Sequence, residues 1–261
     1  MLFEARAALV IAQATARESL RNRLLLVGVF VGIGLVAMSV IAASLSIGEQ
    51  SRLIIDLGLA AVGVLGSIMT VALTVMSFAG EISKRTAFPV LARPISRASF
   101  ILGKYLGVIF AMSIVVSTMI IATAITVKLY DTDIPHALWW QWLLSLVEIC
   151  VVAAIAMLFS TLAVPVLAAL YAAGFVIAGN LAFDIQRVAQ AKLEDNVLGG
   201  RALGLASYVL PNLQSLSVRN EAANALPVSH AFIGNGIAYG IAYAIAVLIL
   251  SMIVFSRRKA I

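Results

Sequence analysis

The stretch that decides the fold is GEISKRTAFPVLARPISRASFILGKYLG, residues Gly80 to Gly107. It lies between two uncharged runs that are each long enough to cross a bilayer. Because cations beside membrane spans are retained on the cytoplasmic side, its excess of cations predicts the orientation of the whole chain. The charged residues are Glu81, Lys84, Arg85, Arg93, Arg97 and Lys104.

The same stretch contains residues typical of the starts of two helices. Thr86 can cap a first helix, because its hydroxyl can accept a hydrogen bond from a first-turn amide, and Pro89 then falls where no backbone N–H is needed. Pro94 disfavours helical backbone at the residue before it, and Ser96 can cap a second helix that leads into the membrane. The pattern therefore predicts a short helix held against the membrane face by two spans. Its apolar side would be formed by Phe88, Leu91, Ala92 and Ile95.

The order of Glu81, Thr86, Leu91, Pro94-Ile95-Ser96-Arg97 and Gly103-Lys104 resembles the cytoplasmic loop of ABC-2-type (type V fold) ABC transporter permeases. The resemblance implies that the loop, residues 81–104, is a coupling helix that docks on a separate ATP-hydrolysing subunit. An ordinary basic loop that only sets the orientation is the alternative. The residues that the resemblance assigns to ATPase coupling are Glu81, Lys84, Arg85, Thr86, Phe88, Leu91, Arg93, Pro94, Ser96 and Arg97.

The composition excludes a soluble globular domain. Hydrophobic residues make up 62% of the 261 residues and charged residues only 11%, whereas ordinary globular domains carry about 25% charged residues. The net charge of +6 does not indicate nucleic-acid binding, because the cations flank apolar runs instead of forming a separate basic face. Membrane lipids and a protein partner are the expected partners. The single cysteine, Cys150, excludes an intrachain disulfide and a cysteine metal cluster.

Hydropathy predicts an all-α integral membrane protein with six transmembrane helices and both termini in the cytoplasm. Pro165 divides a long uncharged run into the fourth and fifth spans, and the linker around Ser160–Pro165 is expected to turn tightly. One transmembrane domain, 1–261, would contain the spans 24–47, 57–80, 105–127, 138–160, 164–183 and 232–256.

Residues 1–23 carry cations at helical spacing, which predicts an amphipathic interfacial helix on the cytoplasmic leaflet. A plain positively charged anchor is the alternative. Residues 184–230 are the least apolar part of the chain and are assigned to the outer side. Within them, the part that begins at Leu210 resembles the short outer helices before the last span in the same family.

Tryptophans cluster where the fourth span is expected to begin, which indicates a membrane interface; a substrate entrance is the alternative. They are Trp139, Trp140 and Trp142. Small residues also recur four positions apart in the spans, which favours packing within the subunit over a dimer seam. These pairs are Gly28/Gly32, Gly103/Gly107 and Gly236/Gly240.

No motif for catalysis is found. Gly103-Lys104 lacks the flanking residues of a phosphate-binding loop, so the chain is not expected to hydrolyse ATP or to be an enzyme. Two histidines, His136 and His230, cannot build a His-rich metal site. No catalytic residue, metal site or cofactor is therefore predicted in this chain.

Two carboxylates remain. Glu148 lies inside the fourth span, where an ionisable group is costly. It indicates either a functional role, in a translocation path or at a contact of the fourth span, or a neutral or hydrogen-bonded packing residue. Asp56 is expected at the start of the second span, as a helix cap near Arg52.

The resemblance implies a permease subunit of an ATP-driven exporter in the cytoplasmic (inner) membrane. Its partners would be two copies of an ABC ATPase, which carry ATP and Mg²⁺, and a second permease chain in a homodimer or with a related permease. The alternative function is a membrane scaffold or mechanotransmission subunit that moves no solute, and an integral-membrane enzyme is a third class. The mostly apolar interior leaves lipids, peptides, drugs and glycoconjugates all open as substrates.

Overall fold

The computed structural model describes residues 2–45, 49–83, 96–130, 133–184, 187 and 210–257. All the regular structure in these ranges is helical. The helices are α1 (Leu2–Leu20), α2 (Arg23–Ser44), α3 (Gln50–Ser83), α5 (Arg97–Leu129), α6 (His136–Leu162), α7 (Pro165–Asn180), the 3-10 helix η1 (Leu213–Leu216), α10 (Arg219–Ala223) and α11 (His230–Arg257).

Five of these helices, α2, α3, α5, α6 and α11, are long and apolar enough to cross a membrane. The chain is therefore a multi-pass α-helical membrane protein, as the hydropathy predicted. The expected fifth span, 164–183, corresponds to α7, which has only 16 residues. At 1.5 Å per residue α7 is about 24 Å long, shorter than the ~30 Å hydrocarbon core.

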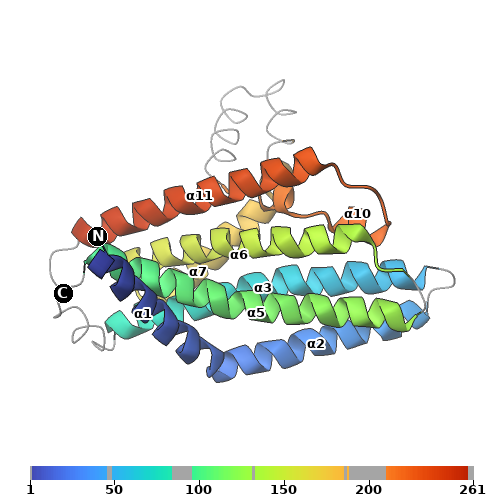
Figure 1. Cartoon of the computed structure of the whole chain (residues 1–261), viewed down its shortest axis with the longest axis horizontal. Helices are drawn as coiled ribbons and strands as arrows, with labels where there is room; N and C mark the ends of the chain where they lie inside the picture. Colours follow the sequence, from blue (N-terminus) through green and yellow to red (C-terminus); the bar gives the residue numbers. More distant parts are fainter. Residues whose placement is uncertain are drawn as a thin grey trace.

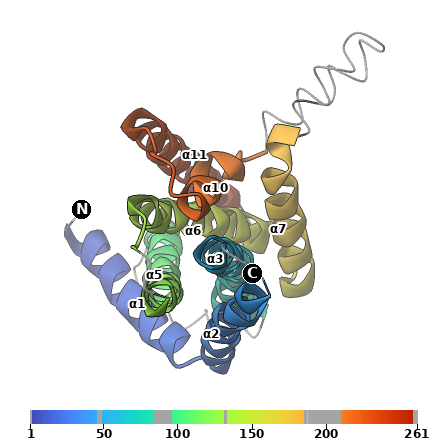
Figure 2. The ribbon, with the colours of Figure 1, turned by 90° about the vertical axis from the view of Figure 1, so that its right-hand side faces the viewer.

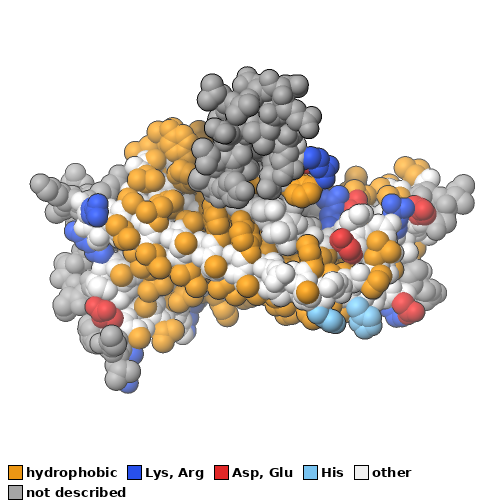
Figure 3. Space-filling model, turned by 90° about the horizontal axis from the view of Figure 1, so that it is seen from above, with side chains coloured by type: hydrophobic (Ala, Val, Ile, Leu, Met, Phe, Trp, Pro, Cys, Tyr) orange, Lys and Arg blue, Asp and Glu red, His pale blue; other side chains and the backbone are white. Residues whose placement is uncertain are grey.

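The bundle is arranged around α3 (Figures 1 and 2). This helix packs against α2, α5, α6 and α7, and the end-on view in Figure 2 shows it near the middle of the group. Two helices lie further out: α11 packs mainly on α6, and α1 packs on the first half of α5. Hydrophobic side chains cover the middle of the face in Figure 3, and charged ones gather toward the two ends, as expected for a membrane protein.

Several helix ends differ from the predicted spans. α3 starts seven residues before the predicted start of the second span and runs on to Ser83, while α5 starts at Arg97. Both ends of the predicted loop 81–104 are therefore helical, and the helix expected after Ser96 is present. The prediction that Ser96 caps a helix is confirmed, since its side chain accepts a hydrogen bond from the Ser99 N–H at 3.2 Å. Residues 84–95, with the helix expected after Thr86, lie outside the described residues.

Asp56 does not cap a helix. The prediction was wrong because α3 begins six residues earlier, at Gln50, so Asp56 already lies in the second turn. The tight turn predicted between the fourth and fifth spans is confirmed: only Ala163 and Val164 separate α6 from α7. Pro165 occupies the first turn of α7, where its missing N–H costs no intrahelical bond.

The glycine pairs pack within the subunit, as predicted. On α5, a Cβ at Gly103 would lie 2.8 Å from the Ala8 carbonyl oxygen, and one at Gly107 would lie 2.7 Å from the Ala12 carbonyl oxygen. The backbones of α1 and α5 therefore touch, which only glycine permits at these positions. The other pairs serve the same purpose: Gly28 and Gly32 receive methionine side chains from α3 and α5, and Gly236 and Gly240 lie against η1 and α6.

Helix α1 has a buried face and an exposed face. Its small residues Ala8, Thr15 and Ala16 are buried toward the bundle, whereas Leu9 and Val10 are exposed. Lys104 of α5 is covered by α1: it is only 5% exposed, and its Nζ lies 4.0 Å from a carboxylate oxygen of Glu18. Lys104 therefore takes part in the α1–α5 contact.

The α1–α5 contact predicts that Gly103→Leu destabilises the protein. The new side chain would have to push α1 away, and such overpacking costs about 1–3 kcal/mol. Thermal unfolding of the purified protein in detergent measures this loss. Gly34→Leu in α2 is the matched control, because a Cβ there meets nothing within 4 Å. Equal melting temperatures for the two variants would contradict the packing described for α1.

Candidate functional site

A cavity of about 360 Å³ lies between α3, α6 and α7. The segment that contains η1 and the start of α10 bounds one of its ends. Such a volume is in the lower range of small-molecule binding pockets. Its walls are mostly aliphatic with a few polar groups, and they are formed by Leu59, Ala60, Gly63, Val64, Ser67, Ile68, Val71, Gln141, Glu148, Ala173, Val176, Ile177, Asn180, Leu213, Ser217 and Arg219.

Glu148 is the carboxylate of this cavity. It lies 12 residues into α6, about 18 Å along the helix axis and therefore near the helix middle. The Ser67 hydroxyl of α3 donates a hydrogen bond to Glu148 Oε1 at 3.1 Å. Within the described ranges, Glu148 makes no ion pair. Glu148 therefore fits both interpretations of its role. It is hydrogen-bonded, as a packing residue would be, and it also lines a cavity, as a residue of a translocation path would.

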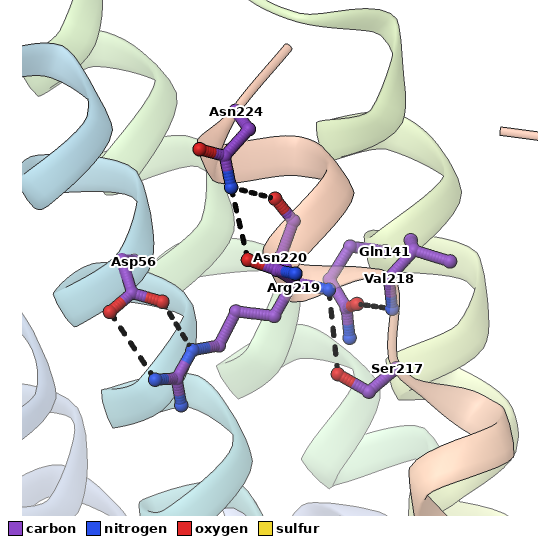
Figure 4. Close-up of polar contacts among 7 residues, drawn as sticks. All are labelled: Asp56, Gln141, Ser217, Val218, Arg219, Asn220 and Asn224. Carbon is purple, nitrogen blue, oxygen red and sulfur yellow. Dashed lines mark hydrogen bonds and ion pairs between the residues drawn. The ribbon is translucent and has the colours of Figure 1, made fainter. Parts of the chain in front are cut away.

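Arg219, which also lines the cavity, forms an ion pair with Asp56 (Figure 4). Arg219 Nε lies 2.6 Å from Asp56 Oδ1, and a second guanidinium nitrogen lies 3.3 Å from Oδ2. The pair is bidentate, the geometry in which arginine binds carboxylates most strongly. It joins the first turn of α10 to the second turn of α3, over a separation of 163 residues.

Gln141 holds the same segment from the side of α6. Its side-chain oxygen accepts a hydrogen bond from the Val218 N–H at 2.6 Å, and its amide nitrogen donates to Ser145 Oγ at 3.1 Å. Gln141 is 5% exposed and Val218 is fully buried, so water cannot replace these bonds. Figure 4 shows Gln141 beside the residues that lead into α10.

The 3-10 helix η1 packs beside the end of α7. Leu213 and Leu216 are buried among the helices, and Gln214 donates a hydrogen bond to the Asn180 carbonyl oxygen at 2.7 Å. Asn212 caps η1 by accepting from the Ser215 N–H. The segment from η1 to α10 thus bounds the cavity because α7 ends at Asn180 and leaves room for it.

Of the residues predicted to couple to an ATPase, Ser96 and Arg97 are described with their side chains. Arg97 donates hydrogen bonds to the carbonyl oxygens of Phe255 and Ser256, at 3.2 and 3.3 Å, and its guanidinium lies 5.8 Å from the centre of the Phe255 ring. Arg97 therefore binds the last turn of α11, where the helix dipole favours a cation. Glu81 lies in the last turn of α3, and Lys84, Arg85, Thr86, Phe88, Leu91, Arg93 and Pro94 lie outside the described residues.

The tryptophans do not line the cavity described above. Trp139 is half exposed, Trp140 packs edge-on against the His230 ring, and the Trp142 indole donates a hydrogen bond to Ser117 Oγ at 2.9 Å. This arrangement fits a membrane interface and gives no support to a role at the mouth of this cavity.

Glu148 was the one cavity residue that the sequence indicated. Gln141 could have been found with it, because positions seven apart fall on one face of a helix. Ser67 could not have been singled out, because the apolar helices contain many other serine and threonine residues. Arg219 and Asp56 could not have been paired, since their separation along the chain is too large for any spacing rule.

The helices and the cavity define a multi-pass α-helical membrane protein with a mostly apolar cavity that contains one carboxylate from a membrane-spanning helix. Residues 57–261, most of the chain, match the model of a family described as protein of unknown function (DUF2705). The chain belongs to this family. No curated protein matches the sequence.

The hydrogen bond of Gln141 predicts that Gln141→Leu loosens the segment before α10. The change leaves the buried Val218 N–H without an acceptor, which costs about 1–3 kcal/mol. Faster hydrogen exchange at the Val218 amide and a lower melting temperature measure the effect. Gln13→Leu on the exposed side of α1 is the matched control. Unchanged exchange at Val218 would mean that the bond does not hold this segment.

Proposed function

We propose that this chain is the permease subunit of an ATP-driven transporter of the ABC-2 type. In this proposal α7 also crosses the membrane, which brings the number of spans to six. The protein lies in the cytoplasmic (inner) membrane, and both of its termini face the cytoplasm. A homodimer or a pair of related permeases binds two ATPase subunits, which carry ATP and Mg²⁺. Export is the favoured direction. The observation that carries the proposal is the permease-like cationic segment that joins α3 to α5.

The lengths of α3 and α5 support a segment that projects beyond the membrane. Their 34 and 33 residues correspond to about 50 Å each, against a hydrocarbon core of ~30 Å. Helix α2, with 22 residues, is about 33 Å long. Figure 1 shows that α2 runs beside the first part of α3 and the last part of α5. The remaining part of α3 and α5 would extend into the cytoplasm, flanked by α1.

The contacts at this end support mechanical coupling to several helices. Arg97 links the start of α5 to the last turn of α11, and the glycines of α5 link it to α1. A pull on the segment between α3 and α5 would therefore act on α1 and α11 as well. In the proposal, ATP binding draws the ATPases together, and these four helices carry the movement into the bundle.

The cavity beside Glu148 favours transport over the alternative of a scaffold that moves no solute. A scaffold needs the coupling segment but has no use for a carboxylate next to open space inside its bundle, where ionisable groups are costly. ATP-dependent accumulation of a solute in inverted membrane vesicles would separate the two functions.

The proposal predicts that Arg93→Glu weakens the binding of the ATPase. Arg93 is one of the candidates for a polar docking contact, with Glu81 and Arg97, and reversing its charge would set like charges against each other at the interface. We expect recovery of the ATPase with the tagged permease from native membranes to fall by about tenfold. ATPase activity of the purified complex should fall in proportion.

The matched control is Arg52→Glu. Arg52 lies in the first turn of α3, at the opposite end of the bundle, where it pairs with Glu49 at 3.1 Å. This change should leave ATPase recovery unaltered. The absence of any ABC ATPase from the native complex, or equal recovery with Arg93→Glu and the unchanged protein, would refute the proposed function.

A further inference from the structure

We propose that the cavity between α3, α6 and α7 binds a lipophilic cation, with the Glu148 carboxylate as its counter-ion. The proposal concerns the chemical class of the ligand, which neither the family nor the coupling segment specifies. It is argued from the charges, the walls and the opening of the cavity.

The charges of the cavity do not balance within its own walls. Of its lining residues, only Glu148 and Arg219 carry a charge. Arg219 is already neutralised by the bidentate contact with Asp56, whereas Glu148 has only the Ser67 hydroxyl within hydrogen-bond distance in the described part of the chain. The ionised Glu148 carboxylate would therefore have no positive partner among the lining residues. A bound cation would provide one.

The position of Glu148 makes this deficit costly. A carboxylate near the middle of a membrane-spanning helix is poorly hydrated, and one hydroxyl donor recovers little of the lost hydration. A cation bound beside it would gain much from the low dielectric of its surroundings. An anion would meet repulsion from the same carboxylate. The site therefore discriminates by charge.

The mostly aliphatic walls of the cavity favour a cation whose remaining surface is apolar. Most of the lining side chains are aliphatic, and Val64, Ile68 and Ile177 are about 60% exposed while they also line the cavity. The cavity wall thus continues onto the apolar outer surface of α3 and α7. A ligand dissolved in the bilayer could enter sideways between these helices without crossing a polar surface. A small hydrated ion would gain nothing from such walls.

If the proposed transport function is correct, a lipophilic cation is also the class of substrate, and this part of the inference rests on that function. Binding itself does not require the ATPase. The two ideas can therefore fail separately: a chain without an ATPase partner could still bind the cation, and a true permease could fail to bind it.

The test uses two ions of nearly the same shape and opposite charge, tetraphenylphosphonium and tetraphenylborate. Equilibrium binding of each is measured on the full chain in lipid nanodiscs, with empty nanodiscs as the background. We expect saturable binding of the phosphonium and none of the borate. Glu148→Gln keeps the shape of the side chain and removes its charge, and should weaken phosphonium binding by about tenfold or more.

Two further variants complete the design. Ala173→Phe fills the cavity from α7 and should also abolish phosphonium binding. Glu49→Gln removes an exposed carboxylate outside the cavity and should leave binding unchanged. Size-exclusion profiles and melting temperatures show whether each variant folds.

Three results would overturn the inference: equal binding of the two ions, phosphonium binding that survives both Glu148→Gln and Ala173→Phe in folded protein, or no saturable binding to the unchanged chain. If the unchanged chain shows no saturable binding, Glu148 is neutralised by protonation and not by a bound cation. ATP-dependent uptake of tetraphenylphosphonium into inverted vesicles then tests the substrate role, and its failure with intact binding would count against transport only.

Discussion

Close backbone packing at small residues is the constraint on which this structure depends. Apolar helices gain little by leaving lipid for one another, since both surroundings are equally apolar, so association relies on van der Waals contact and a few hydrogen bonds. Gly103 and Gly107 let α1 touch α5, and Gly236 and Gly240 let α11 approach η1 and α6. Each contact fixes the rotation of a helix about its axis. That rotation decides which polar side chains face the interior.

The cavity exists because this packing is incomplete on one side. Helix α7 stops at Asn180, and the segment from η1 to α10 occupies part of the space beyond its end. The two residues between η1 and α10, Ser217 and Val218, are not helical, and buried backbone groups of such a connection must find partners in the protein. Gln141 is the partner of Val218, and the Asp56–Arg219 pair fixes the same segment to α3. What remains open is the space beside Glu148.

Helix α3 connects the two regions to which we assign a function. One end of it leads into the cationic segment proposed to bind the ATPase, and its middle carries Ser67, which donates to Glu148. Asp56, nearer the other end, holds the segment that bounds the cavity. In the proposed function, a movement of α3 would change the Ser67 and Asp56 contacts together. The cavity and its closing segment would then respond to the nucleotide state of the partner.

Hydropathy and capping are local properties, and they were sufficient to predict the helical membrane class, the position of most helices, the cap at Ser96 and the turn before Pro165. The sequence also indicated Glu148, since a carboxylate inside an apolar run is costly wherever its helix packs. The folded arrangement was needed to show that Glu148 meets Ser67 beside a cavity, that Asp56 pairs with Arg219, and that Lys104 and Arg97 bind other helices. These contacts join residues far apart in the chain, and they depend on helix rotations that long-range packing alone sets.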